Sequence, residues 1–390
     1  MAVSPVPPDP DPAVVWAAVL AEEGVGPARI ATWWSAHGSL REALIAARRG
    51  RAAGVSPDVA AALKRGTRDA ALRRADHDVR RWRAAHDALL ALGDPDYPLA
   101  LAQLAGPPPL LFVRGRLPEA VLAPPGLPRA VAVVGTRRPT AWASAFAHDL
   151  ARDLARADVA VVSGLALGVD GAAHRGALEG IRDAVRAGTI AVLAGGLDAV
   201  HPPHHERLAA RIREAGAVVS EAPPGVRPRR GSFPRRNRIV VGLSALLAVV
   251  EAPFRSGVAH SVRAAVGADR DVFVVPQRPD TAVGRAAAAL IRDGAGPLTG
   301  ARDLLQALGI APAAGGDRTA LPDDATERAI VLRLREHGPA HEDGLADCAP
   351  SPLALLATLG RLEADGQIAR DAAGRWRARS DVANVLVDRT

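Results

Sequence analysis

Short apolar runs rich in β-branched residues recur along the middle of the chain and alternate with segments of helical character. These runs lie at residues 130–135, 159–164, 189–196, 217–221, 246–252 and 272–276. Strands that are apolar along their whole length are buried on both faces, which is typical of a parallel sheet covered by helices. The pattern predicts an α/β fold, with an extended Rossmann-like parallel-sheet domain at residues 76–310.

The residues that follow each run indicate where this sheet binds a ligand, because such sheets bind at the carboxyl ends of their strands. Glycine, hydroxyl and arginine side chains gather there: Gly135, Thr136, Arg137 and Arg138 after the first run, Ser163, Gly164 and Gly168 after the second, and Ser256 and Gly257 after the fifth. Glycines admit a ligand close to backbone amides, and helix N-termini and arginine forks attract phosphate. The set predicts a phosphate-binding crevice, although tight strand-to-helix packing also selects glycine.

The stretch "GSFPRRNRIVVGLS", residues 231–244, places an aromatic side chain and arginines directly before an apolar run. Phe233 offers a face on which a base can stack, and Asn237 can bond a base edge or pin the turn. Positive charge for a passing backbone comes from Arg235, Arg236 and Arg238. Aromatic platforms in an electrostatic groove hold single strands without sequence preference.

One of these arginines, Arg238 above all, has a competing interpretation as a structural residue. Buried against Glu221 or Glu251, it would hold the loop, and its removal would strand a carboxylate. The overall charge does not decide the matter: 49 basic against 42 acidic residues give a formal net charge of +7. That balance permits an anionic partner without requiring one.

Motifs of common phosphate and acyl chemistry are missing from the sequence. No Gly-x-Gly-x-x-Gly follows the first run, and there is no phosphate loop or nucleophile elbow, so we expect no cofactor and no enzyme. Prolines beside His201, His204 and His205 indicate a loop turn, and no metal site is predicted. The alternative is an enzyme that processes nucleotides or sugar phosphates, with Asp170 or Glu251 as its catalytic carboxylate.

Helical patterns flank the sheet domain. Residues 1–11 read as a disordered leader and 12–75 as a helical domain. There "GVGP", residues 24–27, joins two helices either as a helix-hairpin-helix, whose turn amides can face a phosphate, or as a plain helical hairpin.

The composition of residues 311–323 predicts a linker, and the pattern of residues 324–380 predicts a winged helix. We expect Leu353, Leu356, Leu359 and Leu362 to face its core. Arg361 is accompanied by Glu363 and Asp365, so this domain is predicted to serve protein interaction or regulation rather than phosphate binding.

Several long motifs follow one another in the order and spacing of a known family. They include "VAVVGTRRPT" (131–140), "VVSGLALGVDGAAHRGAL" (161–178), "TIAVLAGGLDAVHP" (189–202), "FPRRNRIVVGLS" (233–244) and "VVEAPFRSG" (249–257). On these residues the chain resembles the DprA/Smf family of DNA-processing proteins. The family usually has Tyr-Pro at His201-Pro202 and Pro-Gly at Pro276-Gln277, so the fine geometry of the pocket stays open.

The resemblance implies a protein that binds single-stranded DNA, protects incoming DNA and helps load a RecA-type recombinase during transformation. It also implies a homodimer through the Rossmann-like domain and no catalytic turnover. The residues that follow the strands and the resemblance together give the expected DNA-binding residues: Arg137, Arg138, Ser163, Gly164, Gly168, Phe233, Arg235, Arg236, Asn237, Arg238, Ser256 and Gly257. One cysteine, Cys348, and the lack of a signal peptide or membrane span predict a cytoplasmic protein.

Overall fold

The computed structural model describes residues 10–378 except 38, 123–127, 254–255, 311–320, 323, 365–366 and 372. The chain divides between Leu298 and Thr299 into two compact units. Apart from residues 10–11 and 321–322, the predicted leader and linker lie outside the described residues. The further division of the first unit into a helical domain and a sheet domain stays a prediction.

The first unit begins with helices that pack around tryptophans. They are α1 (Pro12–Leu20), α2 (Pro27–Ser35), α3 (Leu40–Arg48), α4 (Pro57–Gly66) and α5 (Asp69–Ala85). The Trp16 ring meets those of Trp33 and Trp34 edge to face, at centroid distances of 6.0 and 5.3 Å. Trp16 Nε1 also donates a buried hydrogen bond of 2.7 Å to the carbonyl of Leu92. This bond ties the helices to the loop that follows β1 (Ala88–Ala91), the first edge strand of the sheet.

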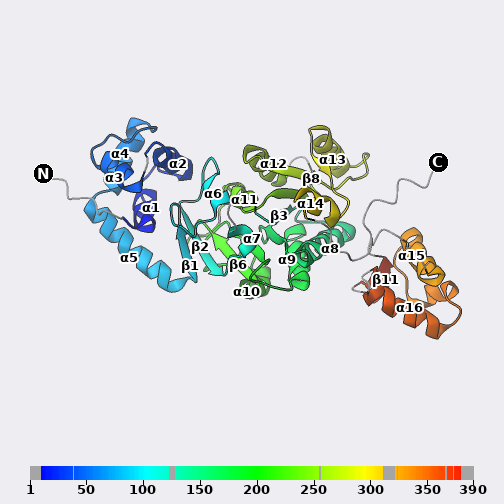
Figure 1. The fold of residues 1–390 in the computed structure, drawn as a ribbon. Coiled ribbons are helices and arrows are strands. Elements are labelled where there is room, and N and C mark those ends of the chain that lie inside the picture. Colours follow the sequence, from blue (N-terminus) through cyan, green and yellow to red (C-terminus); the bar gives the residue numbers. More distant parts are fainter. Residues whose placement is uncertain are drawn as a thin grey trace. The chain divides into compact units, whose positions relative to one another are not determined.

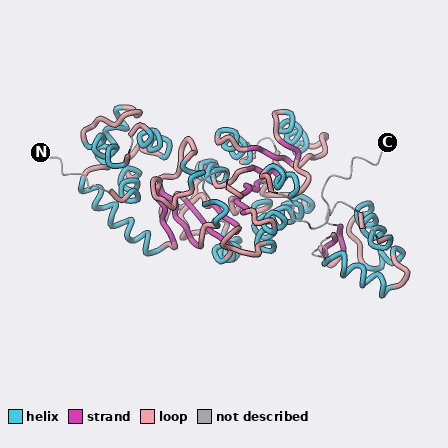
Figure 2. The backbone as a smooth tube through the Cα atoms, viewed as in Figure 1, coloured by secondary structure: helices cyan, strands magenta, loops and turns pink. Residues whose placement is uncertain are grey.

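The sheet has the strand order β1-β2-β6-β5-β4-β3-β7-β8-β9. Its other strands are β2 (Leu110–Gly115), β3 (Ala130–Val134), β4 (Ala160–Ser163), β5 (Thr189–Val192), β6 (Gly216–Ser220), β7 (Leu246–Val249), β8 (Asp271–Val274) and β9 (Gly296–Pro297). Strands are drawn as arrows in Figure 1 and in magenta in Figure 2. From β6 to β9 all neighbours are parallel, whereas β1 and β2 join the edge antiparallel. Each predicted apolar run overlaps one of β3 to β8, which confirms the α/β fold.

Helices cover the sheet between successive strands. The longer ones are α8 (Ala141–Arg156), α9 (Val169–Gly180), α10 (Glu206–Glu214), α11 (Ser232–Gly242), α12 (Val258–Gly267) and α13 (Ala282–Arg292); the shorter ones are α6 (Leu99–Ala102), α7 (Glu119–Leu122) and η1 (Pro203–His205). The chain passes from β3 to β4 on one side and later returns to β7 on the other. The order of strands therefore reverses at β3, which is where such sheets open a crevice for ligands.

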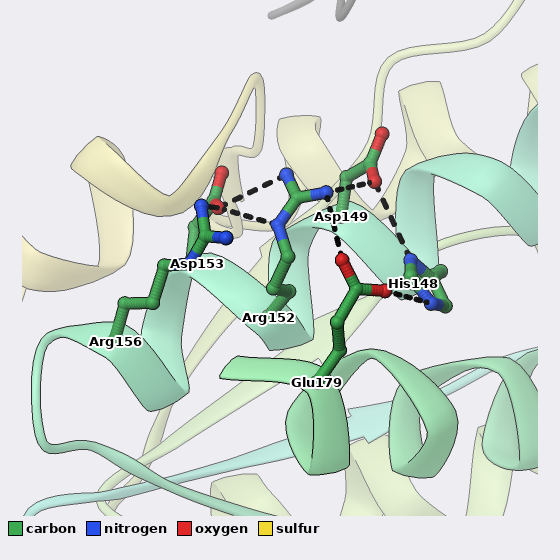
Figure 3. A network of polar contacts seen from close by, with 6 residues as sticks. All are labelled: His148, Asp149, Arg152, Asp153, Arg156 and Glu179. Atoms are coloured by element: carbon green, nitrogen blue, oxygen red, sulfur yellow. Dashed lines mark hydrogen bonds and ion pairs between the residues drawn. The ribbon is translucent and has the colours of Figure 1, made fainter. Parts of the chain in front are cut away.

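Helices α8 and α9, which follow β3 and β4, pack closely against each other. A Cβ on Gly176 would lie 1.9 Å from the carbonyl oxygen of His148, so only glycine lets the two backbones approach this far. Arg152 is fully buried and its Nη1 donates to Asp149 over 2.9 Å, while Glu179 of α9 lies near both Arg152 and His148 (Figure 3). A buried guanidinium with carboxylate partners is an interaction that holds helices rather than a ligand site.

The second unit follows the order expected of a winged helix. It contains α14 (Ala301–Ala307), α15 (Ala325–His337), η2 (Glu342–Cys348), α16 (Pro352–Ala364) and the antiparallel pair β10 (Ile368–Arg370) and β11 (Trp376–Ala378). Its apolar core includes Ile330, Leu334, Leu359, Leu362 and Trp376.

The prediction that four leucines of α16 face this core is wrong for two of them. Leu353 is 79% exposed and Leu356 54% exposed, whereas Leu355 is buried. Positions 355, 359 and 362 share one face of the helix because they are separated by four and three residues, and 353 and 356 lie on a different face. In neither unit does the described part of the chain contain a helix with both the length and the apolarity needed to cross a membrane.

Candidate nucleic-acid interface

A crevice of about 250 Å³ opens at the carboxyl ends of β3 and β4, with α11 along it. Its walls come from the loops after these strands, from the first turn of α9, from α11 and from the start of α12. Seven of the predicted DNA-binding residues line it: Arg137, Gly164, Phe233, Arg236, Asn237, Ser256 and Gly257. The structure thus gathers residues from separate motifs into one site, with Ala166, Pro234 and Ser261 as lining residues that were not predicted to bind.

Two glycines bring the loops of the crevice together. A Cβ on Gly135 would lie 2.6 Å from Val169 Cγ2, and one on Gly168 would lie 2.4 Å from the carbonyl oxygen of Thr136. Gly168 also has a φ of +82°, which side chains other than glycine rarely adopt. Gly168 does not line the crevice, so its visible role is to let the loop after β4 lie against the loop after β3.

The two predicted serines differ in what their hydroxyls do. Ser163 is fully buried and donates a 2.6 Å hydrogen bond to the carbonyl of Val133, so its hydroxyl points into the sheet. The expectation that Ser163 donates to a phosphate does not fit this geometry. Ser256 lines the crevice, and its buried hydroxyl has no hydrogen-bond partner among the described residues, which leaves it available to a ligand.

Arg236 forms the floor of the crevice and is only 5% exposed. Its Nη1 donates to the carbonyl oxygens of Gly164, over 2.6 Å, and Val192. Burial lowers the pKa of Arg236 to about 10, so it remains a cation at neutral pH. We predicted that Arg236 holds a flanking phosphate. Its hydrogen bonds to these two carbonyl oxygens instead give it a structural role in supporting the loop after β4.

Asp170 lies beside Arg236 and supports the same loop. Its carboxylate accepts hydrogen bonds from the amides of Gly164 (3.2 Å) and Ala166 (3.3 Å). Burial raises the pKa of Asp170, and the neighbouring Arg236 cation opposes this rise. Asp170 and Arg236 thus both support the loop after β4, one through its amides and the other through the carbonyl of Gly164.

At the mouth of the crevice the Phe233 ring lies close to two polar side chains. The guanidinium carbon of Arg137 is 5.2 Å from the centre of the Phe233 ring, a cation–π arrangement. The His201 ring is tilted by 57° against Phe233 at 5.9 Å. Arg137 is exposed, so it is able to leave the ring face when a base takes its place.

The other arginines of α11 point away from the crevice. Arg238 forms an ion pair with Glu221, which is the competing interpretation considered for it from the sequence. Arg235 is exposed and has no ion pair among the described residues. Both line a separate groove beside the turn at residues 24–29, while Arg138 lines neither cavity.

Only one of the two candidate catalytic carboxylates lines the crevice. Glu251 accepts hydrogen bonds of 3.0 Å from the amide and the hydroxyl of Thr140, at the start of α8, and does not line the crevice. Asp170 does line it. Within the described residues, no group of three or more histidine, cysteine, aspartate or glutamate side chains is placed to hold a metal ion.

Comparison with known proteins decides the family. The family model for DNA recombination-mediator protein A matches residues 88–309. The chain belongs to this family. The match contains every strand of the sheet and all residues of the crevice, and it confirms the resemblance inferred from the motifs.

Individual relatives agree with this assignment. The chain is 39% identical over 235 residues to Protein Smf of Synechocystis, which covers 59% of this chain and 57% of that protein. It is 32% identical over 219 residues to the DNA processing protein DprA of Bacillus subtilis, covering 56% and 70%. The X-ray structure of DNA processing protein A from Streptococcus pneumoniae matches with a TM-score of 0.61 and 27% identity, over 75% of this chain and 97% of that one. The alignment thus spans less than two thirds of the Synechocystis relative.

Proposed function

We propose that this protein binds single-stranded DNA without sequence preference in the crevice between β3, β4 and α11. One observation carries the proposal: a cation, Arg137, lies over an aromatic ring, Phe233, at the mouth of a crevice with a buried guanidinium at its floor. Bases stack on aromatic rings and phosphates bind arginines, whatever the sequence of the strand. Membership of a family of DNA recombination mediators supports a nucleic acid as the ligand.

The expected binding mode follows from the geometry. A base displaces Arg137 from the Phe233 ring and stacks there, and Arg137 then meets the adjacent phosphate. The Ser256 hydroxyl is free to donate to the same strand. Because a base inside a duplex is stacked and paired, only an unstacked strand presents its face to this ring, and we expect preference for single strands.

The wider role proposed for the protein is that of a recombination mediator. It would protect incoming single-stranded DNA and help load a RecA-type recombinase on it. It would act in the cytoplasm as a homodimer through its sheet-containing unit. The family assignment supports these points, and each requires its own binding assay with the recombinase or a measurement of molecular mass in solution.

The test is a titration of labelled poly-dT, with duplex DNA and free nucleotides as competitors. We expect poly-dT to bind with an affinity that falls with salt and to resist both competitors. Phe233→Ala should cost roughly 1–3 kcal/mol of binding, the usual worth of one base–aromatic stack. Trp142→Ala is the matched control, since Trp142 is an exposed aromatic of α8 that stacks on Phe146 and does not line the crevice. Preference for duplex, or equal loss in both variants, would refute the proposal.

A nucleotide- or sugar-phosphate-processing enzyme is the competing function, because Asp170 lines the crevice and burial raises its pKa. We expect no release of base or phosphate from nucleoside monophosphates. Release that disappears in Asp170→Asn would favour the enzyme instead.

A further inference from the structure

A second groove, of about 630 Å³, lies in the first unit between α11 and the turn that joins α1 to α2. One wall is that turn, residues 24–29; the other holds Arg235 and Arg238 of α11, with Ala105 and Gly106 between them. Gly106 follows α6, which packs against α11 (Figure 1). The groove therefore joins the N-terminal helices to the helix that lines the crevice.

The groove is basic on both walls. Arg29 faces the two arginines of α11, and no acidic residue is among its described lining residues. Arg235 has no ion pair among the described residues. Arg238 uses one nitrogen for Glu221, while its buried Nη1 has no hydrogen-bond partner in the described part of the chain. Unpaired guanidinium nitrogens on a basic wall fit an anion such as a phosphate.

The turn is held in place by packing. A Cβ on Gly106 would lie 3.6 Å from both the Cα and the Cβ of Ala28, an ordinary van der Waals distance, so the two segments are close neighbours. Behind the turn, Trp34 of α2 lies against Gly93, where a Cβ would be 2.9 Å from its ring. Trp16 is hydrogen-bonded to Leu92. The basic walls therefore keep a defined separation.

The two cavities are connected by α11 itself. Phe233, Arg236 and Asn237 face the crevice. Arg235 and Arg238, three residues apart and so on one helix face, line the groove. A strand that crosses α11 thus meets the aromatic crevice on one side and the basic groove on the other.

We infer that the groove binds the sugar-phosphate backbone of the same single strand whose base enters the crevice. This rests on the proposed function and adds the N-terminal helical turn to the DNA path. The turn "GVGP" then acts as a phosphate-facing hairpin rather than a plain one, with Arg29 as its cation.

The experiment compares a short and a long oligonucleotide on the intact chain. Oligo-dT of about four nucleotides fills the crevice alone, and oligo-dT of about sixteen nucleotides crosses both cavities. Wild type should bind the longer strand more tightly. Arg29→Ala and Arg235→Ala should each weaken binding of the long strand about fivefold and flatten its salt slope by about 0.7, with short-strand affinity unchanged.

Arg213→Ala is the control, since Arg213 is an exposed arginine in the last turn of α10, just before β6, and lines neither the crevice nor the groove. Ala28→Glu is the second variant, because Arg29 also donates to the carbonyl of Gly24 and its loss could alter the turn. Ala28 is exposed in the groove, and a carboxylate there should weaken long-strand binding further.

The outcomes separate the two proposals. If neither strand binds, the proposed function fails and this inference fails with it. If the short strand binds but the groove variants behave like Arg213→Ala, or if wild type gains nothing with length, the inference is overturned and the crevice stands.

Discussion

Helices α11 and α16 carry the side chains by which each unit would meet a partner, and they differ in what lies beneath them. Near α11 the buried groups include ionisable ones, Arg236 of the helix itself and Asp170 and His174 of α9. Beneath α16 the core is apolar, and Thr358 is the only buried polar residue among the described residues of that unit. Charged groups beneath a crevice make it polar. Above an apolar core, only the exposed side chains of the helix determine what binds.

The exposed faces of α11 and α16 also differ in charge. On α11 Arg235 is exposed and has no ion pair among the described residues. On α16 the exposed side chains include Leu353 and Leu356, and Arg361 pairs with Glu327 at 3.0 Å. Such a face attracts phosphate poorly. This supports the proposal that the second unit serves protein interaction or regulation.

Removing the buried arginine of α11 is expected to have the largest effect on folding. Arg236→Ala strands the Asp170 carboxylate and two carbonyl oxygens, which should cost about 3–5 kcal/mol of unfolding free energy. Arg235→Ala, on the same helix but exposed, should stay within about 0.5 kcal/mol of wild type. Urea denaturation measures both. Wild-type stability in Arg236→Ala would show that this arginine is not a structural strut.

Acid should destabilise the first unit through His174. Burial, with His205 and Arg236 nearby, lowers the pKa of His174 to about 3. The neutral imidazole is therefore the folded form, and its contribution to stability is complete above the unfolded pKa of about 6.5 and is lost as pH falls toward 3. By pH 4.5 the loss is about 2–3 kcal/mol.

The control for this pH effect is His174→Gln, which keeps a donor for the Thr189 hydroxyl. Asp170 acts in the opposite sense because its pKa is raised, so the difference between wild type and variant isolates the histidine. Hydrogen exchange read separately for the two units should show the acid effect in the first unit only. Equal acid sensitivity in residues 324–378 would contradict the contrast between the two units.

The smallest effect is expected from removing the second unit. A chain that ends at Leu321 keeps the whole sheet and should bind poly-dT within about twofold of wild type. Filter binding or anisotropy suffices for this comparison. A loss of more than about tenfold would make the second unit a principal DNA contact.

The sequence predicted the parallel strands well, because a strand buried on both faces is a continuous apolar run. It did not predict β1 and β2, since nothing in residues 88–91 or 110–115 specifies that they pair antiparallel with each other and with β6. Long-range pairing of this kind depends on the tertiary fold. The clustering of residues after β3 and β4 was predictable, because the carboxyl ends of parallel strands all lie at the same edge of the sheet.

The roles of the arginines within "FPRRNR" could not be assigned from the sequence. The sequence does not settle whether residues 233–244 form a helix or a strand, and the helical phase decides which side chain points inward. In the helix Arg236 points to the floor, while Arg235 and Arg238 share another face. The same uncertainty of phase placed Leu353 and Leu356 in the core of the second unit, from which the structure excludes them.

The salt dependence of poly-dT binding tests the central claim most directly, namely that the exposed cation at the mouth of the crevice holds the strand. The observed binding constant is measured against salt for wild type, Arg137→Ala and the control Arg213→Ala. Arg137→Ala should flatten the logarithmic slope by about 0.7, the share of one phosphate on a single strand, and the control should keep the wild-type slope. An unchanged slope in Arg137→Ala, or equal flattening in the control, would contradict the account.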